Sequence, residues 1–415
     1  MNPLMWLLYP FLKFLSLFVF WLPEFQERRL FEIKNDKEPG AQSFKKLGEV
    51  ADICFEFSSE GEYQQVASLV DDAILAGKKV ELVFFSPSVE KAIRELHEKH
   101  PEVIRYLRYP IIAFSPFRMS RCFSRWSTSK KLVLVRYDFF PEFLLWAKKK
   151  NHELFIIWAS LKKERVKGKD ISWFKSLFYR NASKIIFASA ADLEKAMELG
   201  FKGMHYDFRM EQIRRRVVAR DEKFQRVFSS YENLKKQMVH YPREKRLIIG
   251  NAWPHDLFLL KNLPEDFFVV VVPHQLSGDI LKTMKQSLEE LDRVVIEISD
   301  APVERQGDTF LINKKGVLCE LYADFGHSYV GGGFGVGVHS ILEPLVAGSE
   351  SIACGPKHER STEFDVAKNL NRMSQVNTPE DFSKWLLQGS LIGSEDSLQN
   401  VFKSYAEFRK EVISC

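Results

Sequence analysis

A glycine-rich stretch followed by a glutamate is the part of this sequence best suited to hold a phosphorylated ligand. Residues 329–348 read YVGGGFGVGVHSILEPLVAG. An aromatic and β-branched run leads into five closely spaced glycines, and Ser340 then opens an amphipathic segment that contains Glu343. This order predicts strand, glycine loop and helix, and such a helix start presents unpaired N–H groups to an anion. Because Val338 stands where the dinucleotide fingerprint needs its third glycine, NAD binding is disfavoured.

Glu343 has two interpretations on sequence alone. Ser340 and Glu343 stand three residues apart, as the two ends of a capping box do, so Glu343 could simply cap the helix. It could equally accept hydrogen bonds from a ligand beside the glycine loop.

Two carboxylates follow predicted strands in the first half of the chain. Glu62 comes shortly after the apolar run at 53–57, and Asp138 directly follows the run at 132–137. A carboxylate at a helix start beside a cleft can take a proton from a substrate hydroxyl. The alternatives are a first-turn Glu62 that complements the helix dipole and an Asp138 that caps its helix.

Strands and helices alternate along most of the chain, in two series. The first begins at Ala51 and the second near residue 246, and each predicts a parallel sheet covered by helices. Because ligands bind at the carboxyl ends of such strands, the residues just after each strand are the site candidates. The predicted regions, in chain order, are a membrane anchor at 1–25, an N-terminal domain at 26–215, a connection at 216–245, a C-terminal domain at 246–395, and a terminal helix at 396–415 that could cross back to the first domain.

The N-terminus and the charge distribution point to a membrane surface. Residues 3–23 are almost all apolar or aromatic, with Lys13 the only charge, so they could span a bilayer, lie on it, or pack on the protein. Residues 1–220 carry 38 Lys and Arg against 27 Asp and Glu, whereas residues 221–415 carry 22 against 28. The first half therefore has a charge of +11, which suits the cytoplasmic face of a membrane.

Cysteine and acidic residues show no metal-binding pattern. The five cysteines are scattered without C-x-x-C spacing, which favours reduced thiols in the cytoplasm. No Asp-x-Asp motif ends a predicted strand, and no His, Asp and Glu set has metal-ligand spacing. We expect no metal cofactor. No nucleic-acid recognition motif accompanies the basic residues.

Several motifs together resemble the 3-deoxy-D-manno-octulosonate (Kdo) transferases of lipopolysaccharide synthesis. The string GGGFGVGVHSILEPLVAG, taken with Gly355-Pro356, is similar to their donor-site segment, and Ser59-Glu60-Gly61-Glu62 is similar to the motif that carries their catalytic base. The resemblance implies the GT-B fold, in which two Rossmann-like domains face each other across a cleft. It also implies CMP-Kdo as donor and a lipid A precursor as acceptor.

The resemblance assigns roles residue by residue. Glu62 would be the general base, Asp138 would support it or the acceptor, and Arg209 would bind the Kdo carboxylate, unless Arg209 forms an interdomain salt bridge. The CMP part of the donor would contact a larger set, namely Pro273, His274, Lys315, Gly316, Val317, Ser340, Ile341, Leu342 and Glu343. A solvated loop position is the alternative for His274. Glu56, Arg136 and Lys315 differ from the residues usual in the family.

These implications predict an inverting, metal-independent transferase that moves Kdo from CMP-Kdo to a lipid IVA-like acceptor at the inner membrane. Two alternatives remain. The chain could be a GT-B transferase or epimerase for another nucleotide sugar, or a non-catalytic membrane-surface module of the same fold.

Overall fold

The computed structural model describes most of the chain beyond the predicted anchor. The described ranges are 38–108, 123–135, 147–148, 150–161, 165–166, 169–170, 179–299, 309–358, 361–388 and 395–413. The predicted anchor at 1–25 and the candidate Asp138 lie outside them, as does Arg136. None of the helices in the described ranges has both the length and the apolar character needed to cross a bilayer.

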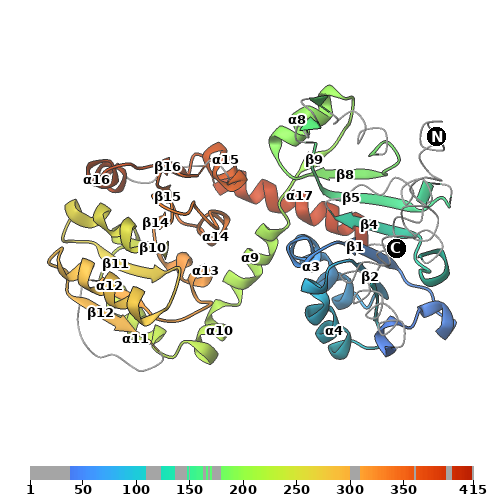
Figure 1. The fold of residues 1–415 in the computed structure, drawn as a ribbon, viewed down its shortest axis with the longest axis horizontal. Coiled ribbons are helices and arrows are strands. Elements are labelled where there is room, and N and C mark those ends of the chain that lie inside the picture. The colour runs from blue at the N-terminus through green and yellow to red at the C-terminus, as the bar shows by residue number, and fades with distance from the viewer. Residues whose placement is uncertain are drawn as a thin grey trace, which may run out of the picture. The chain divides into compact units, whose positions relative to one another are not determined.

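The chain forms two compact units. One comprises the described residues up to Arg209 together with those from Ser404 onward, and the other is Met210–Lys403. Each contains a seven-stranded, parallel α/β sheet, as the two alternating series predict (Figure 1). Residues 216–245, predicted as a connection, lie within the second unit, and the last residues of the chain lie within the first.

The sheet of the first unit has the order β3-β2-β1-β4-β5-β8-β9, so β1 lies near its centre. Its strands are β1 (Ile53–Phe57), β2 (Val80–Phe84), β3 (Ile104–Arg108), β4 (Lys131–Val135), β5 (Glu153–Ala159), β8 (Lys184–Phe187) and β9 (Met204–His205). Its helices include α3 (Glu60–Leu75), α4 (Glu90–Lys99) and α8 (Ala190–Glu198), with short 3-10 turns η1 (Pro39–Ala41), η2 (Phe44–Leu47) and η3 (Pro87–Val89). A two-stranded antiparallel ribbon pairs β6 (Arg165–Val166) with β7 (Lys169–Asp170).

The sheet of the second unit has the order β12-β13-β11-β10-β14-β15-β16. Its strands are β10 (Arg246–Ala252), β11 (Phe268–Pro273), β12 (Val295–Ile298), β13 (Thr309–Ile312), β14 (His327–Val330), β15 (Ser351–Cys354) and β16 (Met373–Gln375). Its α-helices are α9 (Arg209–Val218), α10 (Arg220–Val227), α11 (Tyr231–Met238), α12 (Gly278–Glu289), α13 (Leu318–Leu321), α14 (Leu342–Ala347), α15 (Thr362–Asn369) and α16 (Pro379–Leu387). The 3-10 turns are η5 (Arg243–Lys245), η6 (Pro254–Asn262) and η7 (Tyr322–Asp324).

Strand burial explains why the apolar runs in the sequence are continuous. All six residues of β11, FVVVVP, are buried because helices cover both faces of a parallel sheet. β1 is equally buried although it contains Glu56. The strand runs thus mark the centre of each sheet.

The helices α10 and α11 explain why residues 216–245 do not behave as a connection. Phe224, Phe228, Tyr231 and Leu234 are buried in one cluster with residues of the second unit's sheet, such as Val270. Their spacing of three or four residues forms an apolar stripe along otherwise charged helices. The high charge of this segment therefore belongs to its solvent-facing side.

The terminal helix α17 (Glu395–Ile413) joins the first unit through its last two turns. Phe408 and Val412 are buried, and the Tyr405 hydroxyl donates a hydrogen bond of 3.0 Å to Asp72 on α3. Arg409 forms an ion pair of 2.7 Å with the same carboxylate. The first unit is therefore built from two separate parts of the chain.

Candidate active site

Glu62 is held rigidly at the start of α3, just beyond the carboxyl end of the central strand β1. Its side chain is buried, and its Oε2 accepts a hydrogen bond of 2.5 Å from the backbone N–H of Ser58. Ser59 is the N-cap residue but its own side chain makes no capping bond. The Glu62 side chain therefore accepts a backbone N–H just before the helix, as the glutamate of a capping box does. This hydrogen bond holds the carboxylate at the strand end, where ligands bind in such sheets.

A second buried carboxylate of the first unit, Glu81 on β2, has a structural role that sequence reasoning missed. Ser127 Oγ donates to it at 2.5 Å, and Thr128 donates through its backbone N–H at 2.8 Å. Burial raises the pKa of Glu81, and these hydrogen bonds oppose the rise. Glu81 lies near the amino end of its strand, so it organises the entry of the chain into β4 and not the candidate site.

Arg209 forms a local ion pair where α9 begins. Its Nε lies 2.9 Å from Oδ1 of Asp207, its Nη2 lies 2.5 Å from Oδ2, and its backbone N–H donates to Oδ1 at 3.0 Å. Asp207 therefore caps α9 and binds the Arg209 guanidinium with both oxygens. A substrate carboxylate at Arg209 would have to compete with Asp207.

The glycine loop after β14 packs against the protein itself. Gly331 donates its N–H to the Gly250 carbonyl at 2.8 Å, and Gly332 donates to Asp256 Oδ2 at 3.0 Å. A Cβ at Gly331 would lie 2.4 Å from the Asn251 oxygen, and one at Gly333 would lie 2.5 Å from the Cα of Gly355. These glycines allow backbones to approach closely. The N–H groups of Gly331 and Gly332 are therefore occupied by the protein, which corrects the expectation of a phosphate cradle at this part of the loop.

Asp256, which sequence analysis did not single out, organises this loop. Its Oδ2 accepts hydrogen bonds from the backbone N–H groups of Trp253 at 2.9 Å and Gly332 at 3.0 Å. Its Oδ1 lies 3.3 Å from the donating Tyr329 hydroxyl. The side chain is fully buried, and burial raises its pKa despite these donors. Asp256 follows β10 by four residues, so the strand-end rule could have found it.

The helix after the loop begins later than predicted, and the capping interpretation of Glu343 is wrong. Ser340 has a left-handed φ of 53°, the N-cap is Ile341, and α14 begins at Leu342. The Glu343 carboxylate does not bond to the Ser340 backbone but lies 3.5 Å from Arg216 Nη1. Glu343 therefore faces α9.

A charged cluster joins the two predicted donor segments, 315–317 and 340–343. Arg216 pairs with Glu343 and also with Glu320, whose Oε1 lies 3.0 Å from Arg216 Nε. Lys223 lies 2.7 Å from the same oxygen and donates to the carbonyl of Gly316. Burial raises the pKa of Glu343, and Arg216 opposes the rise. The structure thus brings these segments together around a carboxylate able to accept a hydrogen bond from a hydroxyl.

Pro273 and His274 end β11 beside a row of stacked rings. The His274 ring lies 5.0 Å from Trp253 and 5.6 Å from His339, and the His255 ring stacks with Trp253 at 6.0 Å. Burial lowers the pKa of His274, with a further contribution from His339. The rings come from strand ends and from the loop before Ser340, so they border the predicted donor segments. His255 and His339 were not predicted.

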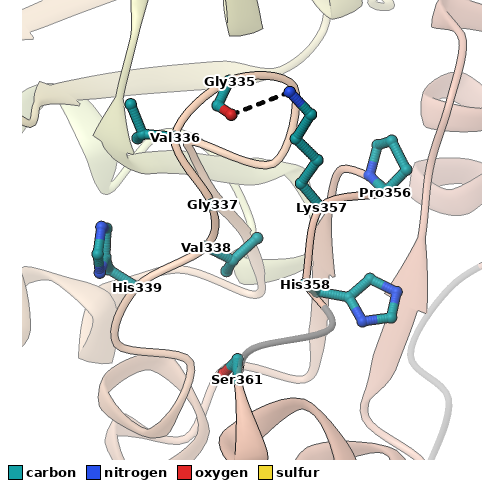
Figure 2. Close-up of a pocket in the computed structure, with 9 residues that line it drawn as sticks. All are labelled: Gly335, Val336, Gly337, Val338, His339, Pro356, Lys357, His358 and Ser361. Carbon is teal, nitrogen blue, oxygen red and sulfur yellow. Dashed lines mark hydrogen bonds between the residues drawn. The ribbon is translucent and has the colours of Figure 1, made fainter.

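A pocket of about 700 Å³ opens beside this row, between the glycine loop and the turn after β15 (Figure 2). Its described lining consists of Gly335, Val336, Gly337, Val338, His339, Pro356, Lys357, His358 and Ser361. This volume lies within the range of roughly 300–1,000 Å³ that is typical of small-molecule sites.

The described residues offer no group of three His, Cys, Asp or Glu side chains that could hold a metal ion.

The predicted donor-site residues of the second unit lie at one edge of its sheet. Glu62 and Arg209 belong to the first unit, Arg209 at its boundary.

Comparison with known proteins identifies the first part of the chain. Residues 24–209 match the family model of the 3-deoxy-D-manno-octulosonic-acid transferase, or kdotransferase. This part of the chain is therefore similar to a Kdo transferase domain. The resemblance seen in the motifs is therefore confirmed.

Relatives in the genus Rickettsia support the same family. The 3-deoxy-D-manno-octulosonic acid transferase of Rickettsia prowazekii (strain Madrid E) is 26% identical over 246 residues, which cover 56% of this chain and 49% of that protein. The corresponding Rickettsia typhi protein (strain ATCC VR-144 / Wilmington) is also 26% identical, with the same coverage. The matched part thus spans about half the length of these relatives.

Solved structures share the fold at low identity. A glycosyltransferase from Rickettsia africae ESF-5 has a TM-score of 0.51 and 10% identity, covering 88% of this chain and 99% of that one. The UDP-GlcNAc 2-epimerase from Neisseria meningitidis, bound to UDP-GlcNAc, has a TM-score of 0.50 and 11% identity, covering 88% and 94%. The two α/β units therefore have the architecture of GT-B-like proteins.

Proposed function

We propose that this protein is an inverting glycosyltransferase that moves Kdo from CMP-Kdo to the hydroxyl of a lipid A precursor. The observation that carries the proposal is the match of residues 24–209 to the kdotransferase family model. That range includes Glu62, whose Ser-x-Gly-Glu motif resembles the one that carries the family's base. The burial of Glu62 and its fixed place at the end of β1 support this role.

In the proposed reaction, Glu62 takes the proton of the acceptor hydroxyl. The acceptor oxygen then attacks the anomeric carbon of Kdo, on the face opposite to CMP. The bond between that carbon and the phosphate oxygen breaks, and its electron pair leaves with CMP. Asp138 would support the base or the acceptor.

The second unit would bind the nucleotide. Glu343 would accept hydrogen bonds from the ribose hydroxyls, and the backbone of Lys315, Gly316 and Val317 would meet the base. The charged cluster supports this assignment because it connects Gly316 to Glu343 through Lys223, Glu320 and Arg216. His274 would lie beside the nucleotide within the row of rings.

We also propose that residues 1–25 anchor the protein at the cytoplasmic face of the inner membrane and that catalysis needs no metal. The apolar run at 3–23 and the charge of +11 in residues 1–220 support the anchor. Loss of turnover in EDTA, restored by a divalent cation, would contradict metal independence. A chain starting at residue 26 that still floats with anionic vesicles would contradict the anchor.

The test of the main proposal uses the full chain, CMP-Kdo and a lipid IVA-like precursor. Mass spectrometry should detect the precursor with added Kdo, together with released CMP. Calorimetry with CMP and UDP would separate this function from another nucleotide-sugar enzyme. Binding of UDP but not CMP, or vesicle binding without binding of either, would overturn the proposal.

The Glu62→Gln variant tests the catalytic base, and Glu60→Gln is its matched control. The amide oxygen of the substituted glutamine can still accept the Ser58 N–H, so the helix start should remain intact. Turnover should fall by roughly 10²–10⁴-fold, the usual contribution of general base catalysis. The exposed Glu60 lies two residues away on the same helix turn, and its variant should keep wild-type turnover. Full turnover by Glu62→Gln would limit Glu62 to helix capping.

A further inference from the structure

The pocket beside the glycine loop contains a cation that the proposed nucleotide contacts do not use. Its two walls follow β14 and β15, which are neighbouring parallel strands, so the pocket lies at the carboxyl edge of the second sheet (Figure 2). The described lining contains no carboxylate. Among these described lining residues, Lys357 is the one that carries a permanent positive charge.

Lys357 is held between the two walls of the pocket by its backbone and its side chain. Its N–H donates to the Gly333 carbonyl at 2.8 Å, and its own carbonyl accepts from Val338 at 3.3 Å. Its ammonium donates to the Gly335 carbonyl at 3.1 Å. An ammonium has three donors, and this bond uses one of them. Lys357 is exposed, and its ammonium can direct its other donors to a ligand in the pocket.

The neighbouring histidines have different positions in the pocket. His358 stacks on Phe364 at 3.6 Å and lies 2.9 Å from Gln375 Oε1, so it forms part of the wall. His339 is exposed and stacks on His274. It borders both this pocket and the segment that begins at Ser340. A ligand group placed here would be adjacent to the proposed nucleotide site.

The chemistry of the proposed donor, CMP-Kdo, indicates which ligand group the pocket binds. A sugar that carries a carboxylate at its reacting carbon needs a cation beside that carbon, whereas a neutral sugar does not. Arg209, the earlier candidate for this role, already binds Asp207 through both of that residue's oxygens. We propose that the pocket binds the carboxylate of the donor's acidic sugar, with Lys357 as the counter-charge and His339 as a hydrogen-bond partner. This proposal rests on the function proposed above.

Calorimetry on the full chain tests the assignment by comparing CMP-Kdo with CMP. The Lys357→Gln variant removes the charge but keeps a polar side chain of similar length. Its affinity for CMP-Kdo should fall by roughly tenfold or more, because a hydrogen bond to a charged group is lost. Its affinity for CMP should stay within about twofold of wild type, since CMP lacks the sugar carboxylate.

Three further variants sharpen the comparison. Lys357→Arg keeps the charge and should recover much of the CMP-Kdo affinity. His339→Gln should weaken CMP-Kdo binding more than CMP binding, and it provides a second test if Lys357→Gln folds poorly. Lys368→Gln removes an exposed lysine on α15 and should change neither affinity.

Each remaining outcome has one meaning. An equal loss for CMP and CMP-Kdo would assign the pocket to the nucleotide phosphate and overturn the carboxylate assignment. Unchanged binding of CMP-Kdo by a folded Lys357→Gln would overturn it as well, with the proposed function intact. A wild-type protein that binds neither ligand would overturn the proposed function itself.

Discussion

At the residue scale, burial assigns different tasks to carboxylates that look alike in the sequence. Glu81 and Asp256 are buried and bonded to two or more donors, so they fix loops. Glu62 is also buried, but it lies at the carboxyl end of the central strand. Glu343 faces Arg216 and retains a partly exposed carboxylate. Position relative to the strand ends therefore distinguishes the candidates for chemistry from the structural carboxylates.

Replacing Asp256 tests its role in the glycine loop. Asp256→Ala would leave the N–H groups of Trp253 and Gly332 without their shared acceptor. Each buried group left unsatisfied costs about 1–3 kcal/mol, so the variant should lose that amount or more of its unfolding free energy. Urea unfolding followed by tryptophan fluorescence measures the loss. Asp256→Asn keeps one oxygen acceptor and should lose less; equal losses would show that the hydrogen bonds are not the cause.

At the element scale, a glycine is required in the glycine loop but not at the start of α12. Gly333 lies against Gly355 without room for a side chain, whereas a Cβ at Gly278, the first residue of α12, meets nothing within 4 Å. Close packing therefore requires a glycine at position 333 of the loop, whereas position 278 of α12 has room for a side chain.

A pair of alanine substitutions tests the loop packing. Gly333→Ala should destabilise the second unit by about 1–3 kcal/mol, the usual cost of overpacking. Gly278→Ala should be neutral or stabilise it by up to about 1 kcal/mol, because alanine restricts the unfolded chain. Thermal or urea unfolding measures both. A stable Gly333→Ala protein would contradict the tight contact.

The end of α17 is expected to contribute strongly to the first unit. Phe408 packs against Phe155 and Phe208, with ring centroids 6.0 and 5.5 Å apart. Phe408→Ala should cost about 3–5 kcal/mol, as for other buried phenylalanines. Hydrogen exchange should report the loss in β5 while leaving β11 protected. The adjacent exposed Glu407 provides the control, since Glu407→Ala should change little.

At the scale of the whole molecule, the two units have separate cores, and the chain leaves the first unit and later returns to it. Each sheet has its own buried clusters. The net charge also divides unevenly, with the basic excess in residues 1–220. We therefore expect the unfolding free energy to depend on the packing of each core, and membrane binding to depend on the charge of residues 1–220.

His327 should make the stability of the second unit depend on pH. Its Nε2 lies 3.0 Å from the Glu244 carbonyl, so this nitrogen donates, and its Nδ1 accepts from the Ser351 hydroxyl at 2.7 Å. Burial lowers the pKa of His327 in the folded protein. The unfolded chain therefore takes up the proton first, and the stabilisation present above about pH 6.5 should be lost as the pH falls toward the folded pKa.

Urea unfolding between pH 8 and pH 5 tests this dependence. His327→Gln should be less stable than wild type at pH 8, and its unfolding free energy should fall less steeply with acid. Burial raises the pKa of Asp256 and Asp324, which gives the opposite slope, but both residues are present in the two proteins. Identical slopes would exclude His327 as the titrating group.

The sequence by itself determined the two parallel sheets, the strand ends and the resemblance to the Kdo transferases. Apolar runs and the spacing between them are local properties, so the strands such as β11 could be located without a structure. The ordered motifs around Glu62 and Glu343 were likewise readable, and the family match at residues 24–209 includes the motif around Glu62.

Only the tertiary structure decided which residues work together. Glu343 pairs with Arg216, more than a hundred residues earlier, and Asp256 binds Gly332 across the sheet edge. The start of α14 depends on the left-handed backbone at Ser340, which overrode the local Ser-x-x-Glu pattern. Such pairings depend on which strands lie side by side, and sequence periodicity does not contain that information because it describes each element alone.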